Sequence, residues 1–541
     1  MMLEASSSED LPIADLAPSR AVGPDKGEEA ACRRLALGFI LAFALARVAL
    51  AYAFGFGIDE AYTVVISRRL DLSYFDHPPL HQWIAHFTGR LIGEGLSMRL
   101  PFIALFAGTG WLIYLLTRKL FGARAGVWAV FGLNASAFFF ASAGSWIVPD
   151  GPLLFALAAA AYVFAKLFFE EADASAAWRL WLAGGFWLGI AALSKYNAVF
   201  FAVGLVAFIA LSPRQRRWFA HPAPYLAALL CLVVLSPVLV WNAENDWVSF
   251  VFQGVRGAPH GQWRPLQVVA MILGQIVWVT PWIFVPLAAA LVAATRLGRK
   301  DPRRFYLVCL ALPPIIFFTL TPLWGSHGQP HWPMPGWLFV YPLLGAWLVE
   351  AAARGFNLRR WAIWSAALLA VLGVAIGSQA ATGWVERLGL LPASVTDPTR
   401  EALNWDALKT SPLLGGEGGK PPGFVLSNHW SEAGKMALAL GAKMPVIVSP
   451  DDPRGIAFLQ DPAAYVGRDA VIIVPINQIS TLPDVFRAYF EELGAPQKVS
   501  IGRGGMDELD LALFPAHRLT QPLPLPYPRR AALNPSSKAS P

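Results

Sequence analysis

The stretch GIDEAYTVVISRRLDLSYFDHPPLHQW, residues 57–83, follows directly after the first long apolar run of the chain. It carries acidic and histidine side chains in a cluster: Asp59, Glu60, Asp71, Asp76, His77 and His81. Ionisable groups are costly in hydrocarbon, and where they gather beside membrane segments they often mark a functional surface. The stretch therefore predicts a loop at the membrane surface that carries chemistry.

The residues between Asp59 and Asp76 have the apolar spacing of a helix. Apolar side chains recur in this segment at Tyr62, Val65, Ile66 and Leu70. This spacing would lay a short amphipathic helix on the membrane interface. The following DHPPL, residues 76–80, stiffens the chain and ends the helix, because proline lacks an amide donor and disfavours helix in the residue before it. We therefore expect a rigidly presented Asp76–His77 pair.

The composition of the whole chain is that of a polytopic membrane protein. Of its 541 residues 56% are hydrophobic and only 15% are charged, whereas soluble domains carry about 25% charged residues. A run of roughly twenty apolar residues crosses the hydrocarbon core. The predicted spans lie at about 34–54, 100–117, 122–142, 151–169, 178–193, 197–212, 224–241, 266–292, 304–322, 333–352 and 361–381.

The basic residues predict the orientation of these spans. If the spans alternate, the Lys/Arg clusters fall on one side of the membrane: 32–34, 117–120, 213–218, 296–304 and 353–360. Positive loops are typical of the cytoplasmic side, and they account for the net charge of +7 without nucleic acid as a partner. The loop 55–99 and everything after about residue 382 then lie on the other face, which in a bacterium is the periplasm.

The chain divides into four predicted regions. Residues 1–33 are polar and rich in Ser, Ala and Pro, and are expected to form a disordered cytoplasmic tail rather than a signal peptide. The membrane domain spans 34–381. In 382–520, the β-branched runs GFVLSN (423–428), MPVIVSP (444–450) and DAVIIVP (469–475) alternate with the helix-like stretches SEAGKMALALG and LPDVFRAYFEELG. This alternation predicts a small periplasmic α/β domain. Residues 521–541 form a loose tail. The three cysteines have no metal-ligand or redox spacing.

The first-loop sequence DEAYTVVISRRLDLSYFDHPPLHQWI closely resembles the corresponding loop of bacterial membrane glycosyltransferases of the GT-C class. The similar enzymes are the protein O-mannosyltransferases and the lipid A aminoarabinose transferases, glycosyltransferase families 39 and 83. Further matching segments follow in the same order: SWIVPDGPLLF (145–155), ALSKYNAVF (192–200), SPVLVWNAENDWVSFVFQ (236–253), HWPMPGWLF (331–339) and REALNWDAL (400–408). The resemblance implies a mainly α GT-C fold with about eleven or more transmembrane helices.

The resemblance also implies a reaction and its residues. The donor would be a sugar on a polyprenyl phosphate, and the acceptor a hydroxyl or another nucleophile at the non-cytoplasmic face. The Asp of the first-loop DE motif, the expected catalytic carboxylate, is Asp59, and the Asp of the second external loop is Asp150. Glu60 completes the expected catalytic set, although a solvated loop carboxylate is the alternative reading. The phosphate-holding position is His77, where the aminoarabinose transferases carry Lys, and this difference argues against an aminoarabinose donor.

Transfer from a prenyl phosphate needs a base for the acceptor proton and positive charge for the departing phosphate. Asp59 is the candidate base. Lys195 interrupts an otherwise apolar hairpin, and a charged residue in such a place is usually functional. The alternative is a lysine whose long side chain reaches the membrane interface. Arg68, Arg99 and Asp76 are further candidates at the donor phosphate. Acceptor or sugar contacts are expected from Tyr62, Asn242, His327, His331 and Trp332.

No cofactor is indicated with certainty, and a divalent metal is left open, since His327 and His331 lie on a Pro- and Gly-rich loop rather than a helix. The sequence predicts a glycosyltransferase of the bacterial inner membrane that uses a lipid, such as lipid A or another glycolipid, or a protein as acceptor. The alternatives are a lipid or sugar transporter or flippase, which would place ionisable residues within the spans, and a non-catalytic relative.

Overall fold

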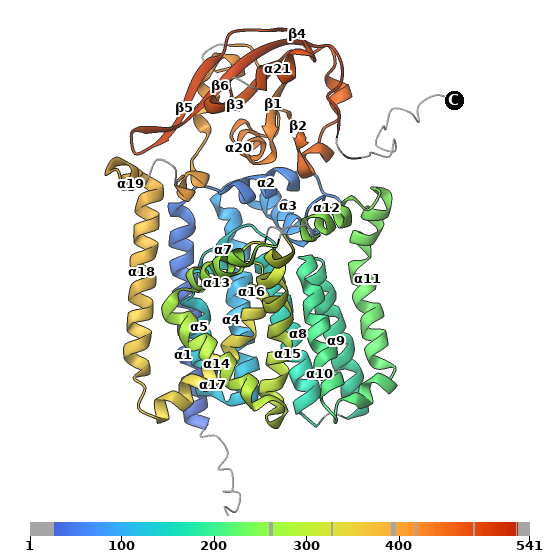
Figure 1. Ribbon diagram of the computed structural model, residues 1–541, viewed down its shortest axis with the longest axis vertical. Coiled ribbons are helices and arrows are strands. Elements are labelled where there is room, and N and C mark those ends of the chain that lie inside the picture. Colours follow the sequence, from blue (N-terminus) through green and yellow to red (C-terminus); the bar gives the residue numbers. More distant parts are fainter. Residues whose placement is uncertain are drawn as a thin grey trace, which may run out of the picture.

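The computed structural model describes residues 26–171, 173–258, 263–325, 328–390, 396–416, 419–479, 482–525 and 527. A body of long helices carries a small sheet domain at one end, and the helices of the first loop lie between the two (Figure 1). Most of the tail predicted at 521–541, and residues 1–25, lie outside the described residues. The first helix begins at Lys26, so residues 26–33 are helical and not part of the predicted disordered tail.

Within the described residues, eight helices are long and apolar enough to cross a membrane, or nine if one bent pair forms a single span. Some of these spans also contain a short helix that adjoins the long one. The long helices are α1 (Lys26–Ala53), α4 (Leu100–Phe121), α8 (Asp150–Phe169), α11 (Ala223–Glu244), α14 (Pro281–Leu297), α15 (Pro302–Leu320), α17 (Val340–Ala353) and α18 (Leu358–Thr382). The helices α9 (Ala174–Ala192) and α10 (Val199–Leu211) pack beside them. The predicted mainly α membrane fold is confirmed.

Two predicted spans are broken in the structure. The span expected at 266–292 is two helices, α13 (Pro265–Val279) and α14, because Thr280 has a positive φ of 78° and Pro281 provides no amide donor. The span expected at 122–142 bends by 84° between α5 (Ala123–Asn134) and the following short helices over Ala137–Ser145.

The buried guanidinium of Arg47 in α1 holds this second break. Its Nη2 donates to Asn134 Oδ1 at 2.8 Å, and its Nε donates to the carbonyl of Phe140 at 3.0 Å. The same group lies over the rings of Phe106 and Phe140. Carbonyls that leave a helical ladder inside a membrane need such a partner.

The predicted first-loop helix is confirmed as α2 (Ile58–Ser67). It does not lie on the membrane interface, however, because every residue from Glu60 to Ser67 is buried. The helix also ends well before the DHPPL motif, and Pro79 instead caps the next helix, α3 (Leu80–Ile92). The first loop is therefore an internal layer between the membrane body and the C-terminal domain (Figure 1).

The C-terminal domain has one sheet of order β2-β1-β3-β6-β4, with β5 paired to β6. The strands β1 (Phe424–His429), β2 (Val446–Asp452) and β3 (Ala470–Pro475) pair in parallel and match the three runs expected from the sequence. The predicted helix over SEAGKMALALG is α20 (Trp430–Leu440). The run LPDVFRAYFEELG divides into α21 (Leu482–Arg487) and β4 (Phe490–Leu493), and the β5–β6 hairpin (Gln497–Arg503 and Met506–Leu519) was not predicted.

Helix α20 packs directly on α2, so the C-terminal domain is seated on the first loop. Tyr62, Val65 and Ile66 of α2 share one hydrophobic core with Trp430 and Met436. A side chain at position 434 would meet the Tyr62 amide nitrogen at 3.0 Å, and so the glycine there allows the two helices this close approach. This packing buries the face of α2 that the sequence assigns to the membrane.

A buried ion-pair network ties the end of α18 to the β5–β6 hairpin. Arg503 lies among three carboxylates whose oxygens are all within 4.8 Å of one another: Glu386, Asp397 and Glu508. Its Nη2 is 2.5 Å from Asp397 Oδ2, and its Nε is 2.6 Å from Glu508 Oε1. Because two guanidinium groups, those of Arg503 and Arg400, already pair with these acids, we assign the group a structural role as a clamp and not as a metal site.

Arg503→Met is expected to loosen the C-terminal domain. It leaves the buried Asp397 without its cation and leaves Glu508 with only the longer contact to Arg400, and removing one partner of a buried pair costs about 3–5 kcal/mol. Thermal unfolding in detergent and limited proteolysis would show a lower midpoint and earlier cleavage. Lys498→Met, which removes only an exposed pair with Asp510, is the control. Equal behaviour of the two variants would contradict the clamp.

Candidate active site

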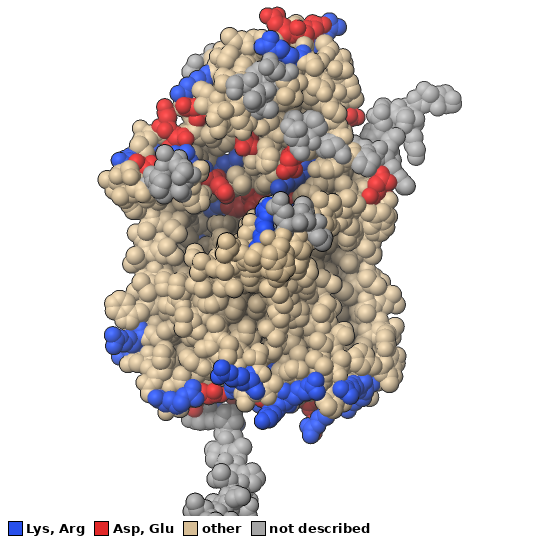
Figure 2. Space-filling model, in the orientation of Figure 1, with Lys and Arg blue, Asp and Glu red and all other residues tan. Residues whose placement is uncertain are grey.

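Asp59 is the first-loop carboxylate that is open to a cavity. It lies in the first turn of α2, with its side chain exposed to the hollow beneath the C-terminal domain, where acidic and basic side chains gather (Figure 2). Loss of bulk water around it raises the pKa of its carboxyl, and the charge of Asp76 raises it further. Within the described part of the chain its carboxylate has no hydrogen-bond partner. Asp59 thus has the accessibility and the basicity of a general base.

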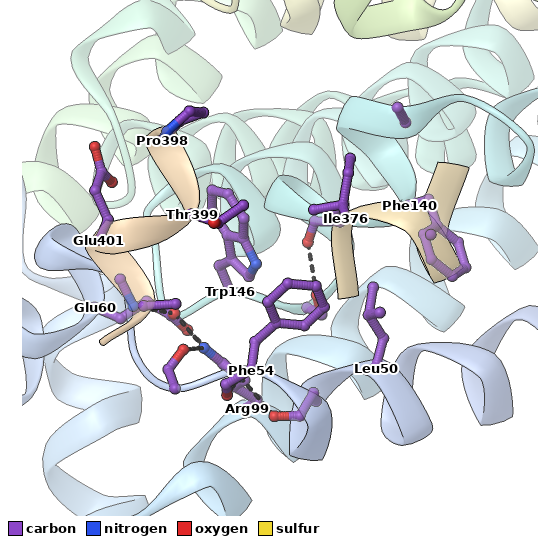
Figure 3. A pocket seen from close by; sticks show the side chains of 18 of the residues that line it. Leu50, Phe54, Glu60, Arg99, Phe140, Trp146, Ile376, Pro398, Thr399 and Glu401 are labelled. Carbon is purple, nitrogen blue, oxygen red and sulfur yellow. Dashed lines mark hydrogen bonds and ion pairs between the residues drawn. The ribbon is translucent and has the colours of Figure 1, made fainter. Parts of the chain in front are cut away.

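Glu60, the next residue, also borders this cavity, but Arg99 holds its carboxylate. Arg99 donates to both of its carboxylate oxygens, at 2.7 and 2.5 Å, and the backbone amides of Ile147 and Gly57 donate to it as well (Figure 3). Glu60 is only 2% exposed. With its oxygens already occupied it cannot take a proton from an acceptor, so we assign it a positioning role in place of the expected catalytic one.

Asp150 and Lys195 form a buried ion pair beside this site. The Lys195 Nζ donates to both Asp150 oxygens at 2.9 Å. Asp150 lies at the N-terminus of α8, and Ser194 fixes the turn before Lys195 by donating to the Pro149 carbonyl at 2.7 Å. The structure thus brings together two residues predicted for separate roles, and each neutralises the other.

The Asp76–His77 pair lies against α2 on the side of the C-terminal domain. The Tyr62 hydroxyl donates to Asp76 Oδ1 at 3.2 Å and accepts from the Gly455 amide at 2.9 Å. Tyr62 is therefore engaged in packing and does not line an open sugar site. Burial and the nearby positive charge of Lys195 lower the pKa of His77 to about 3. His77 is neutral at physiological pH and can offer a phosphate a hydrogen bond but no charge.

Two arginines lie near enough to Asp59 to interact with it electrostatically. Arg256, near the end of α12 (Val248–Gly257), lies over the rings of Phe252 and Trp332 at 5.3 Å. Arg454 of the C-terminal domain lies over Trp430 at 3.9 Å. Both guanidinium groups act electrostatically on Asp76 and His77. Their positive charges, close to Asp59 and the buried Asp76, make the hollow suitable for an anionic ligand.

Two cavities meet next to Asp59. An apolar cavity of about 290 Å³ lies between the ends of α1 and α18, and residues such as Leu50, Phe54, Trp146 and Ile376 line it (Figure 3). A second cavity of about 560 Å³ runs along α20 and β6, and charged side chains such as Arg400, Glu432 and Lys435 line it together with apolar ones. Both cavities are lined by Ile58 and Glu401. An amphiphilic ligand could therefore have its polar and apolar parts on either side of Asp59.

The structure places the remaining predicted residues in several surroundings. Arg68 lies at the far end of α2 and binds Glu94 with two hydrogen bonds at 2.9 and 2.8 Å, so it does not reach the hollow. Asn242 is fully buried and bonds to the Val238 carbonyl and the Ser249 amide, a structural role. His331 is near enough to Asp150 and Lys195 for their charges to affect its pKa, which burial lowers to about 4. His327 lies outside the described residues.

Sequence reasoning missed Arg256, Arg454 and Glu401 as site residues. Glu401 lies within the REALNWDAL segment, and the similarity of this segment to the glycosyltransferases is a sequence signal that points to Glu401. Burial and the negative charge of Asp59 raise the pKa of the Glu401 carboxyl. Arg256 closes the amphipathic α12, where a basic residue beside aromatic ones is a weak signal. Arg454 has no sequence signal, since its place depends on how the C-terminal domain docks.

Comparison with known proteins places these features in a family context. The model of the dolichyl-phosphate-mannose-protein mannosyltransferase family matches residues 76–241. Lipid A galacturonosyltransferase RgtD of Rhizobium johnstonii is 28% identical over 305 residues, covering 53% of this chain and 60% of the relative. An undecaprenyl phosphate-alpha-4-amino-4-deoxy-L-arabinose arabinosyl transferase of Proteus mirabilis is 25% identical over 268 residues, covering 47% of each. The chain thus spans only about half of these relatives.

The fold is similar to that of a solved aminoarabinose-transferase structure. ArnT from Cupriavidus metallidurans bound to undecaprenyl phosphate covers 88% of this chain and 98% of its own, with a TM-score of 0.61 at 16% identity. Its apo form gives a TM-score of 0.57. The predicted resemblance to the GT-C membrane glycosyltransferases is confirmed. This GT-C fold places the first loop and the C-terminal domain around the hollow, and the roles of individual residues in the hollow rest on their geometry.

Proposed function

We propose that this protein transfers a sugar from a polyprenyl-phosphate carrier to a lipid acceptor, with Asp59 as the general base. One observation carries the proposal. Asp59 is the exposed acid of the first-loop motif and lies where an apolar cavity adjoins a second cavity with charged side chains, whereas Glu60 and Asp150 are held by Arg99 and Lys195. The names of both matched relatives, a galacturonosyltransferase and an arabinosyl transferase, agree with a glycosyltransferase.

The proposed reaction needs few groups. Asp59 takes the proton of the acceptor hydroxyl, whose oxygen attacks the anomeric carbon of the donor sugar. The bond from that carbon to the phosphate oxygen breaks, and the carrier leaves as a phosphate monoester without needing an acid. A positioned base contributes roughly 10²–10⁴-fold to such a rate. The arginines of the hollow stabilise the negative charge that develops on the phosphate.

A lipid acceptor fits the apolar cavity better than a protein acceptor does. The cavity between α1 and α18 has a lining dominated by apolar side chains, and it reaches Asp59 from the level of the membrane helices. One relative is named for lipid A as its substrate. An acyl chain in this cavity would bring a glycolipid headgroup to the base, whereas a protein substrate would reach the site through the second cavity.

We further propose that the site faces the periplasm of a bacterial inner membrane. Basic side chains gather at the end of the molecule opposite the C-terminal domain (Figure 2). That end would be cytoplasmic by the positive-inside rule. The ionisable groups of the site lie at one end of the helices and not midway along them. This position favours catalysis over transport.

A transfer assay with purified protein in detergent tests the proposal. Radiolabelled polyprenyl-phosphate sugars are offered one at a time, with membrane lipid extract or membrane protein as acceptor. We expect one donor to label the lipid fraction. Label in the protein fraction alone would overturn the lipid acceptor, and no label with any donor would overturn the glycosyltransferase proposal in favour of transport or a non-catalytic role.

As pH is lowered, the transfer rate is expected to fall at a higher pH than it would if the base were an aspartate with an ordinary pKa. The pKa of Asp59 is raised, so the base becomes protonated, and the rate is lost, as pH falls through a value above about 4. Asp76→Asn removes a negative neighbour and should move this limb of the kcat/KM profile to lower pH. A limb that stays in place or moves upward would contradict Asp59 as the titrating base.

A further inference from the structure

Arg454 occupies an unusual backbone position at the edge of the C-terminal domain. It begins the 3-10 helix η9 (Arg454–Phe458), and its φ is +43°, in the left-handed region that non-glycine residues seldom adopt. The next amide, of Gly455, donates to the Tyr62 hydroxyl, and a side chain at position 455 would meet Ile66 at 2.7 Å. The close contact with α2 thus fixes the strained path that presents Arg454. Strain of this kind is concentrated at functional sites.

The side chain of Arg454 is held at the hollow by an aromatic platform. Its guanidinium carbon lies 3.9 Å from the Trp430 ring centroid and 5.9 Å from that of Phe252. One side of the group pairs with Asp452, from Nε to Oδ2 at 3.4 Å. The positive charge of Arg454 also interacts electrostatically with Asp59, the proposed base. A stacked guanidinium is pre-organised for planar, two-point binding of phosphate.

Two cations of the membrane domain near the hollow, Lys195 and Arg99, are committed to carboxylates, and His77 itself is uncharged. Lys195 donates to both oxygens of Asp150, and Arg99 to both oxygens of Glu60. His77 stands where the aminoarabinose transferases carry a lysine, but it is neutral, and its Nδ1 is buried without a hydrogen-bond partner in the described chain. The charge that a loop lysine would supply to a phosphate must therefore come from another element.

We propose that Arg454 supplies this charge from the C-terminal domain and contacts the donor phosphate together with Arg256. The inference rests on the proposed function. The bound donor has one negative charge on its phosphodiester, and the departing carrier gains a second when the bond to the sugar breaks. A guanidinium at that phosphate is worth most as the second charge develops. The C-terminal domain then completes the donor site rather than serving only as a cover.

Binding of undecaprenyl phosphate to the full-length protein tests the role of Arg454. Arg454→Gly removes the guanidinium and also relieves the positive φ, so the fold should be retained. A lost charge-assisted hydrogen bond is worth about 1.5–3 kcal/mol, so we expect affinity to fall about ten- to a hundredfold. Binding of undecaprenol, which has no phosphate, should be unchanged. Arg454→Lys, which keeps the charge, should restore part of the affinity.

Arg518→Gly is the matched control. Arg518 also has a positive φ, of 46°, in the same domain, but it pairs with Glu491 on the surface. It should bind undecaprenyl phosphate as the wild type does. Wild-type affinity in Arg454→Gly, or an equal loss for undecaprenol, would overturn the role of Arg454 alone. A wild-type protein that binds no polyprenyl phosphate would instead overturn the proposed function.

Discussion

Asp59→Asn is expected to lower kcat for sugar transfer by about 10²–10⁴-fold while donor affinity stays within a few-fold of wild type. Asparagine has nearly the shape of aspartate but cannot take the acceptor proton. Because Asp59 has no hydrogen-bond partner within the described residues, its replacement breaks no structural contact. The loss should therefore appear in kcat and not in the thermal stability. Steady-state transfer with increasing donor concentration, together with a thermal melt, measures both quantities.

Glu60→Gln is the control for this prediction, since it changes the neighbouring carboxylate of the same motif. It weakens a buried pair with Arg99 and should lower stability, because hydrogen bonds to charged groups contribute about 1.5–3 kcal/mol each. The folded fraction should keep most of its turnover. Full activity in Asp59→Asn, or a selective loss of turnover in a stable Glu60→Gln protein, would reverse the roles assigned to these two residues.

Lys195→Met is expected to remove both stability and activity. It leaves Asp150 as a buried charge without a partner, which costs about 3–5 kcal/mol. Asp150→Asn alone leaves Lys195 buried in the same way. The double variant removes both charges, so its melting temperature should recover toward wild type. A coupling free energy of about 1–3 kcal/mol in this cycle is expected for residues in direct contact.

The activity of the double variant separates two interpretations of this pair. If Lys195 and Asp150 only hold the turn after α9 in place, turnover recovers together with the melting temperature. We expect turnover to stay low, because their charges face the proposed donor site and act on His77. Transfer rates normalised to folded protein, measured for the wild type, both single variants and the double variant, give the answer. Full recovery of turnover would assign the pair to structure alone.

The elements of the fold were predictable where they depend on a pattern within one segment of the chain, such as a helical spacing or a run of apolar residues. The spacing of Tyr62, Val65 and Ile66 predicts α2, and the β-branched runs predict three strands of the C-terminal domain. The sequence could not show that α2 is buried, because its cover is α20, far away in the chain. The break at Thr280–Pro281 was also missed, since its apolar composition continues across both helices.

The site was predictable only in part because charge pairing depends on tertiary contacts. Asp59 and Glu60 are adjacent and chemically alike, and the helix turns one toward the cavity and the other toward Arg99. The position of Lys195 within an apolar hairpin marked it correctly as unusual, but its partner Asp150 is found only in the fold. Arg454 enters the hollow through the docking of a separate domain, which no local pattern encodes.

A single-turnover experiment tests the central claim most directly. Wild-type protein and Asp59→Asn are loaded with equal amounts of the labelled polyprenyl-phosphate sugar, donor binding is confirmed, and lipid acceptor is added. We predict that labelled lipid appears rapidly with the wild type and that the rate is lower by about 10²–10⁴-fold in the variant, although the donor is bound. Equal rates of labelling by the two proteins would contradict it.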